Sequence, residues 1–336
     1  MSPFSPAALP GTVWGYCPIR PYCPACHSRS GNDLAGTEKP DTLSSRFWIT
    51  NPSESPQLSV PIDHHYLPQF YLRRWTRGEK LYRYVRPRKG SAIHQKKVTP
   101  AAVGYQPHLY AYSDGTDEAD RQRLETRFFQ LIDDRAAAAL AKVEEGQRGT
   151  AIDRVGLVQF LLSLLHRSPT RIEHLRDELA ERMKSVPGFD ASDPAQIMRI
   201  ADSINDLLSD LISSRDMVPF VAEMRVFRVD VEAKVKLLTC DIPLMQSHGI
   251  KRPDAFLMLP YAPNRLLILA HDERVALSFS SQEKEALANA VNDAVVKQAR
   301  QVVIASNDEA RAFIEARFDP FSPPPPENGL LTWAAP

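Results

Sequence analysis

The chain has 336 residues, with 41 basic and 41 acidic side chains, so its formal net charge is zero. This balance excludes a global electrostatic field that would draw the protein onto nucleic acid or a membrane surface. The longest apolar run, residues 155–165, is much shorter than the roughly 20 residues that a membrane-spanning helix requires.

Two further features indicate the compartment. The chain begins MSPFSPAALPG, with no basic segment ahead of an apolar one, so no secretory signal is indicated. Four cysteines, three of them within residues 17–26, do not form the disulfide framework of a domain of this size. We therefore expect a soluble, cytoplasmic protein with no membrane partner.

Both ends of the chain have the composition of segments without a packed core. Residues 1–60 contain nine prolines and no helical or strand periodicity, and the run Pro323–Pro326 marks a similar end. Such segments bury too little apolar surface to offset their chain entropy. We expect a disordered or loosely attached leader at 1–60, one domain at 61–319 and a disordered proline-rich tail at 320–336.

The leader contains a group of zinc-type ligands, Cys17, Cys23, Cys26 and His27. Thiolates and imidazoles are the usual ligands of structural zinc. Adjacent Cys26 and His27 rarely both reach one tetrahedral ion, and no second pair follows at the usual distance. Zinc binding and a set of stray thiols are the two interpretations.

The predicted domain opens with residues 61–75, where Pro68 suits the first turn of a short helix because its missing N–H would have no partner there. Residues 80–85 alternate with the two-residue period of a strand. Residues 93–98 are expected to pair with this strand across a turn.

Four helices are predicted next. Residues 117–143 carry apolar side chains with a 3.6-residue period, and Gly146 suits the end of that helix. Residues 151–167 are apolar nearly all round, which predicts a central helix ended by Pro169. The other two helices are predicted at 171–184 and at 193–213.

After residue 217 the period changes to that of strands. Strands are predicted at 224–231, 234–239, 255–259 and 265–270, followed by a helix at 282–299, a strand at 301–305 and a last helix ending near 318. This order predicts an α+β fold, with a mostly helical middle packed on a mainly antiparallel sheet built from N- and C-terminal strands.

Several short motifs stand out along this predicted domain. They are HYLPQFYLR from His65 to Arg73, Glu125 within a helix, Arg167-Ser168-Pro169, Thr239-Cys240-Asp241-Ile242-Pro243, and a strand ending Leu259-Pro260 before Pro263. Together they resemble the pattern of a bacterial family catalogued as domain of unknown function 4238, over about residues 62–306. Cys240 stands where that pattern usually has Ser, and Tyr261 where Leu is usual. The family has no settled activity, so the resemblance implies candidate positions and no reaction.

The first candidates lie around the short helix at the start of the domain. His65 precedes this helix and Gln69 lies within it. A histidine here could bind a metal or transfer a proton, or it could cap the helix or bond to a backbone carbonyl. We take His65 as a candidate catalytic residue and Gln69 as a candidate substrate-binding residue.

Glu125 lies beside the buried stripe of its predicted helix. A carboxylate at the edge of a core must be paired, bound to a metal or neutral. One interpretation is a catalytic carboxylate. The structural alternative is an ion pair with Arg121 or another arginine.

The predicted helix 151–167 is apolar except for one polar row, Gln159, Ser163 and His166, with Arg167 beside it. Such a row points at a partner, a buried network or a ligand, or simply at water. We favour a buried network, in which Arg167 pairs with an anion or a carboxylate because its planar fork suits bidentate contacts. His166 and Arg167 are therefore candidate substrate-binding residues.

Asp241 follows a predicted strand and precedes Pro243. An aspartate in this context often forms a turn, with its side chain bonded to backbone N–H groups. It could also project from the end of the strand into a site, and we take it as a third candidate catalytic residue.

These candidates support two hypotheses of different classes. An imidazole, two carboxylates and a guanidinium suffice for a hydrolase of a phosphodiester or nucleic acid, with a divalent metal as one option for a cofactor. They suffice equally for a structural ionic cluster in a non-catalytic binding or regulatory module. The signature motifs of P-loop, Rossmann, zincin and α/β-hydrolase proteins are absent.

One local block of the sequence is basic. Residues 63–97 contain ten Lys or Arg and two acidic residues, with aromatic residues between them. Proteins that bind single strands combine cations with stacking aromatics in this way, although a strand and a helix with solvated outer faces give the same pattern. Nucleic acid is thus a candidate partner through Arg73, Arg74, Arg77, Lys80, Arg83 and Arg86.

Overall fold

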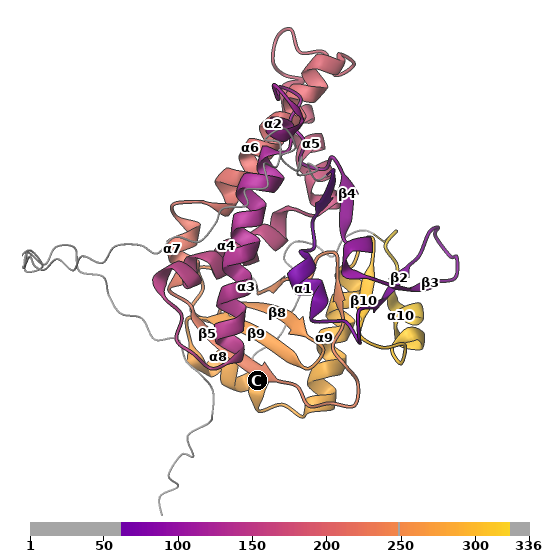
Figure 1. Cartoon of the computed structure of the whole chain (residues 1–336), viewed down its shortest axis with the longest axis vertical. Coiled ribbons are helices and arrows are strands. Elements are labelled where there is room, and N and C mark those ends of the chain that lie inside the picture. Colours follow the sequence, from indigo (N-terminus) through magenta and orange to yellow (C-terminus); the bar gives the residue numbers. More distant parts are fainter. Residues whose placement is uncertain (1–61, 248, 323–336) are drawn as a thin grey trace, which may run out of the picture. The chain divides into compact units, whose positions relative to one another are not determined.

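In the computed structural model, which describes residues 62–247 and 249–322, strands from both ends of the predicted domain share one sheet (Figure 1). β2 (Leu81–Val85) pairs antiparallel with β3 (His94–Val98), as the sequence predicts, and β10 (Val303–Ala305) pairs with β2 on its other side. β6 (Thr239–Cys240) completes this four-stranded sheet.

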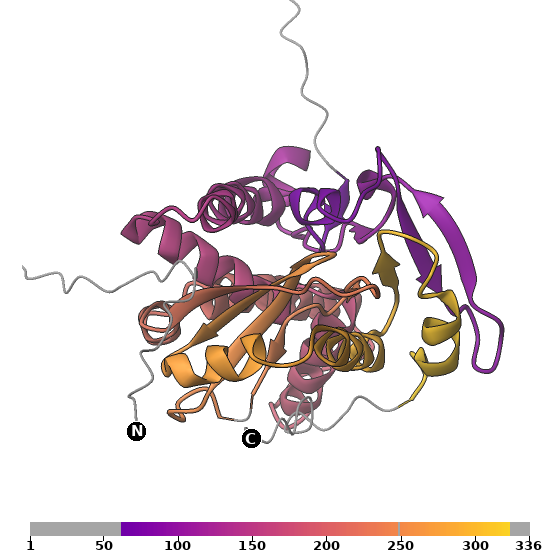
Figure 2. The same ribbon diagram turned by 90° about the horizontal axis from the view of Figure 1, so that it is seen from below.

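The α+β class is confirmed, but the strands are divided over three antiparallel sheets rather than one. The second sheet has the order β5 (Arg225–Asp230), β9 (Arg265–Ala270), β8 (Phe256–Ala262), β7 (Met245–Gln246). The third consists of β1 (Asp63–His65) and β4 (Tyr105–Pro107). Every residue of β8 is buried, because helices cover both faces of the second sheet. Figure 2 shows α3 (Gln130–Glu144) and α4 (Ala151–His166) on one side, and α8 (Glu273–Ser280) and α9 (Lys284–Gln298) on the other.

The strand expected at 234–239 is wrong except at its end, where β6 lies. The N–H group of Leu238 donates to the side chain of Asn292 in α9, at 2.7 Å, and that of Leu237 donates to the carbonyl of Pro263. Because these donors bond outside any ladder, the segment cannot continue the strand.

The long helix expected at 117–143 is interrupted. It consists of α2 (Glu118–Arg121), the π-helix η2 (Leu124–Phe129) and α3, which packs against α4. Pro169 does more than end α4, because it also occupies the first turn of α5 (Pro169–Met183), which Ser168 caps. The remaining helices are α1 (Gln69–Arg73), η1 (Pro100–Ala102), α6 (Pro194–Ile212), α7 (Met217–Ala222) and α10 (Arg311–Arg317).

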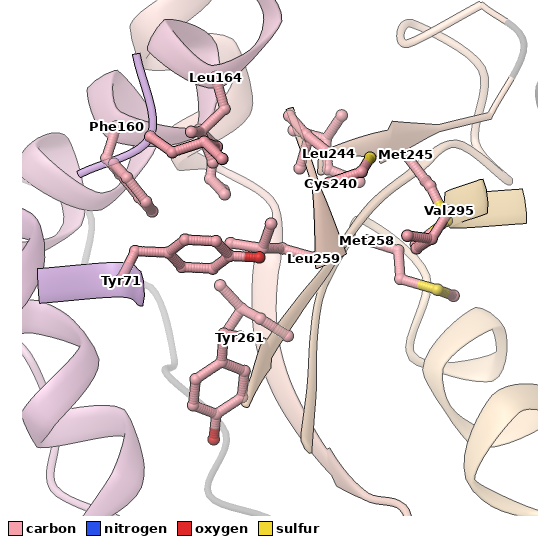
Figure 3. Close-up of a cluster of buried hydrophobic side chains, with 14 of the residues drawn as sticks. Tyr71, Phe160, Leu164, Cys240, Leu244, Met245, Met258, Leu259, Tyr261 and Val295 are labelled. Carbon is pink, nitrogen blue, oxygen red and sulfur yellow. The ribbon is translucent and has the colours of Figure 1, made fainter. Parts of the chain in front are cut away.

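Tyr71 of α1 joins the layers of the core. Its side chain is fully buried and its hydroxyl donates to the carbonyl of Pro260 in β8, at 2.7 Å, so the hydroxyl of Thr239 in β6 donates to Tyr71 at 2.5 Å. Figure 3 shows Tyr71 between Phe160 of α4 and Leu259 of β8. One phenol thus connects the opening helix to both four-stranded sheets.

None of the helices within the described residues is both long and apolar enough to traverse a lipid bilayer.

Candidate functional site

His65 and Glu125 meet although 60 positions separate them. β1 ends at His65, whose backbone N–H donates to Oε1 of Glu125 at 3.4 Å. Glu125 belongs to the π-helix, and π-turns inside α-helices occur frequently at functional sites. The pair with Arg121 is not formed, because Arg121 pairs with Glu118 instead.

Arg167 is the C-terminal cap residue of α4, and its charge is close enough to affect the pKa of Glu125. Its side chain is 0% exposed. Its Nη1 is 3.1 Å from a carboxylate oxygen of Asp133, and its guanidinium lies over the rings of Phe129 and Phe160. The hydroxyl of Tyr110 donates to its backbone carbonyl at 2.6 Å. The expected carboxylate partner of Arg167 therefore exists, within a buried setting.

The sequence analysis did not identify Asp133 as a candidate site residue. Eight residues of regular α-helix leave two side chains about 80° apart around the axis, so the spacing of Glu125 and Asp133 gave no signal. The π-helix changes this phase, and the two carboxyl groups are close enough for Asp133 to raise the pKa of Glu125.

Burial dominates the acidity of both carboxyl groups. It raises the pKa of Glu125 to about 7, against the opposing effect of the Arg167 charge. It raises the pKa of Asp133 to about 6, again opposed by Arg167. Two carboxyl groups therefore share one guanidinium and titrate near neutral pH, which is the range useful for proton transfer.

These shifts make stability depend on pH. The Glu125 carboxyl has an ordinary pKa of 4.5 and a folded pKa of about 7, so the folded state holds its proton more tightly between these values. Its contribution is fully present at low pH and is lost as the pH rises through 7. We expect the E125Q variant to lose less stability than the wild type between about pH 5 and pH 8, measured by urea unfolding. Parallel curves would contradict the raised pKa.

Burial lowers the pKa of two histidines near the site, His65 and His166. At His65, the nearby backbone of Ala101 and Asp63 opposes this effect. At His166, burial lowers the pKa to about 4. His64 is fully buried, and its Nδ1 accepts from the N–H of Tyr110 at 2.9 Å, which fixes the turn after β4.

Four buried polar atoms at this site have no hydrogen-bond partner among the described residues. They are Nε2 of His65, Oε2 of Glu125, and Nε and Nη2 of Arg167. Buried polar atoms in native proteins are almost always hydrogen bonded to protein or water. The cluster His65–Glu125–Asp133–Arg167 therefore contains buried donors and acceptors that no described protein group satisfies.

Asp241 does not join this cluster. It is 1% exposed, and its carboxylate accepts from the N–H groups of Arg300 and Val302 at 3.0 and 3.2 Å. These bonds tie the end of β6 to the segment that leads into β10. The structure thus brings His65, Glu125 and Arg167 together and uses Asp241 elsewhere.

Gln69 lines a surface hollow of about 430 Å³ beside the cluster. Its side chain accepts from Arg73, which also lines the hollow, at 3.3 Å. Ala101, whose backbone is near enough to His65 to affect the pKa of its imidazole, forms part of the wall. The other lining residues are Thr76, Gly78, Glu79, Thr99 and Pro100.

No group of three or more His, Cys, Asp or Glu side chains within residues 62–247 and 249–322 is arranged to hold a metal ion. The ligand group Cys17, Cys23, Cys26 and His27 lies outside the described residues, as do the predicted leader and most of the tail. The divalent metal that the sequence analysis named as an option therefore has no preformed set of protein ligands at the cluster within the described residues.

The basic block divides into structural and exposed cations. Arg74 pairs with Glu144 at 2.8 Å, and Arg86 donates to the backbone carbonyls of Phe318 and Glu315. Arg83 is half-buried in β2. Seven cations remain exposed: Arg73, Arg77, Lys80, Arg88, Lys89, Lys96 and Lys97.

A family model described as "Protein of unknown function (DUF4238)" matches residues 63–309, so the chain belongs to this family. The match includes the whole of the cluster and both ends of the sheet that holds β10. Neither a curated protein nor a solved structure matches the chain.

Proposed function

We propose that this DUF4238 protein is a hydrolase that acts on a phosphodiester or nucleic acid, with the Glu125 carboxyl as its general acid–base group. The proposal rests on the raised pKa of this carboxyl group and on its incomplete hydrogen bonding. Its pKa is about 7, and its buried Oε2 has no partner among the described residues. A group poised in this way exchanges protons efficiently at physiological pH.

The neighbouring residues have distinct roles in this proposal. His65, neutral and half-buried, is the second group able to accept or donate a proton. Arg167 is sealed from solvent, so it acts on Glu125 through its charge and is a positioning residue rather than a clamp on substrate. Gln69 and Arg73 line the adjacent hollow, where the exposed guanidinium suits a phosphate group.

The complete burial of Arg167 also favours a second candidate, a non-catalytic binding or regulatory module. In this case the cluster is an internal polar network that fixes the fold. The working surface is then the exposed part of the basic block, between Arg73 and Lys97, and the partner is nucleic acid, held mainly by phosphate contacts.

The hydrolase and the binding module predict different effects of the E125Q variant. We expect wild-type protein to cleave a chromogenic phosphodiester or a labelled single strand, with a rate that depends on pH near 7, assayed with Mg²⁺, with Mn²⁺ and with chelator. E125Q should lower the rate at least about 100-fold, while E181Q, at an exposed ion pair with Lys184, should not. Retained folding of E125Q is checked by its thermal unfolding.

Binding of the labelled strand without turnover in any condition, by wild type and E125Q alike, would reject the hydrolase and support the module. Absence of both binding and turnover would reject both proposals. The same preparations of wild type, E125Q and E181Q therefore distinguish the hydrolase from the binding module.

A further inference from the structure

A second hollow lies on the other side of the turn between Arg77 and Lys80. It measures about 480 Å³, within the range of small-molecule sites. One wall comes from β2 and β3, and the other from the segment between β10 and α10. The lining residues are Arg77, Glu79, Lys80, Tyr82, Lys97, Asn307, Asp308 and Glu309.

Three cations converge on this hollow: Arg77, Lys80 and Lys97. None of them lies within 4.0 Å of an acidic group of another described residue. The ammonium of Lys97 lies 4.9 Å from the centre of the Tyr82 ring, which holds it over the hairpin. The positive charges are thus available to an anionic group.

Asn307 adds a donor at the same place. The residue is 6% exposed, and its backbone carbonyl accepts from the hydroxyl of Tyr84. Its side-chain nitrogen is buried and has no partner among the described residues. Leaving a buried amide N–H unpaired is costly, so an acceptor from a ligand would stabilise this arrangement.

Three carboxylates, those of Glu79, Asp308 and Glu309, line the hollow as well. They oppose the binding of a bare anion, because their charges balance the three cations. They suit hydroxyl groups instead. When proteins bind a dinucleotide, a carboxylate accepts a hydrogen bond from a ribose hydroxyl. The hollow therefore offers donors for an anion and acceptors for alcohols.

We propose that this hollow binds a sugar phosphate, with the phosphate on the cations and Asn307 and the sugar hydroxyls on the carboxylates. The ligand is either a free sugar phosphate or the sugar–phosphate part of a nucleotide. This site is separate from the His65–Glu125 pair, and the inference does not require that the protein is a hydrolase.

Calorimetric titration of the full chain with ribose 5-phosphate, adenosine monophosphate, inorganic phosphate and ribose tests the proposal. We expect the two sugar phosphates to bind at least about tenfold more tightly than phosphate or ribose, a factor equivalent to about 1.4 kcal/mol. Tighter binding of the nucleotide assigns the site to nucleotides, and tighter binding of ribose 5-phosphate assigns it to free sugar phosphates.

Neighbouring lysines on β3 give a matched pair of variants. Lys97 lies opposite Tyr82 in the ladder and lines the hollow, whereas Lys96 lies opposite Arg83 and does not. Successive side chains of a strand point to opposite faces. We expect K97Q to weaken binding at least about fivefold and K96Q to change it little, although each removes one exposed positive charge.

The carboxylates are tested by the double variant D308N/E309Q, which should reduce the preference for ribose 5-phosphate over inorganic phosphate. Equal weakening by K96Q and K97Q would overturn the proposal, since it would indicate attraction by net charge alone. Inorganic phosphate binding as tightly as ribose 5-phosphate, or no binding of either sugar phosphate at millimolar concentration, would overturn it too.

Discussion

Replacing Arg167 by methionine is expected to lower the free energy of unfolding by about 3–5 kcal/mol, the usual cost of removing one partner of a buried ion pair. The variant leaves Asp133 without the Nη1 contact at 3.1 Å and removes the charge that holds down the pKa of Glu125. Both carboxyl groups must then be protonated or lie unpaired near the core. The loss should therefore be larger at pH 8 than at pH 5.

Urea unfolding at the two pH values measures this effect. R182M is the matched control, because Arg182 pairs with Glu178 on the exposed face of α5 and should change the stability by less than about 0.5 kcal/mol. The double variant D133L/R167M should recover part of the loss, since apolar side chains can replace a buried pair. A loss from R167M as small as that from R182M would show that Arg167 is not sealed as described.

The outcome also bears on function. Arg167 reaches no solvent, so any effect of R167M on turnover must pass through Glu125 or through folding. A positioning role predicts that the pH at which activity is half-maximal rises, because the pKa of Glu125 is no longer lowered by a nearby positive charge. A purely structural role predicts lower stability with an unchanged pH profile.

Periodicity predicted most of the secondary structure because it reports which side of an element is buried. The helix α4 and the hairpin of β8 and β9 were predicted within a few residues. α8 was missed, because its eight residues carry no pattern long enough to recognise. Pro169 was assigned only as a stop, although the same ring is favoured where a helix starts.

The candidate cluster could be predicted only in part. The sequence favoured a carboxylate partner for Arg167, but it could not select Asp133, which lies beside Asp134 in a charged stretch. The π-helix changes the angle around the helix axis between Asp133 and Glu125, and no residue pattern predicts a π-helix. Which distant residues meet depends on strand pairing, so the separation of Asp241 from the cluster was outside the reach of spacing arguments.

Replacing Asp241 by alanine is expected to cost about 3 kcal/mol of unfolding free energy, because two backbone N–H groups lose a charged acceptor and each such hydrogen bond contributes about 1.5–3 kcal/mol. Those groups belong to Arg300 and Val302, which lead into β10. β10 lies between β2 and β6, so its displacement would disturb the whole sheet. D241N retains one acceptor oxygen and should lose less.

The control is D190A, because Asp190 is an exposed aspartate whose carboxylate also accepts from a backbone N–H, that of Ser192 two residues further along the chain. Water can replace that acceptor, so its loss should be much smaller. Chemical unfolding of the three variants checks the order D241A, D241N, D190A. A D241A protein with wild-type stability would mean that the carboxylate is not committed to the backbone, and Asp241 would then return as a candidate for the chemistry. The predicted order instead makes Asp241 a residue that ties the segment before β10 to the end of β6, and it leaves Glu125 and His65 as the proposed acid–base groups.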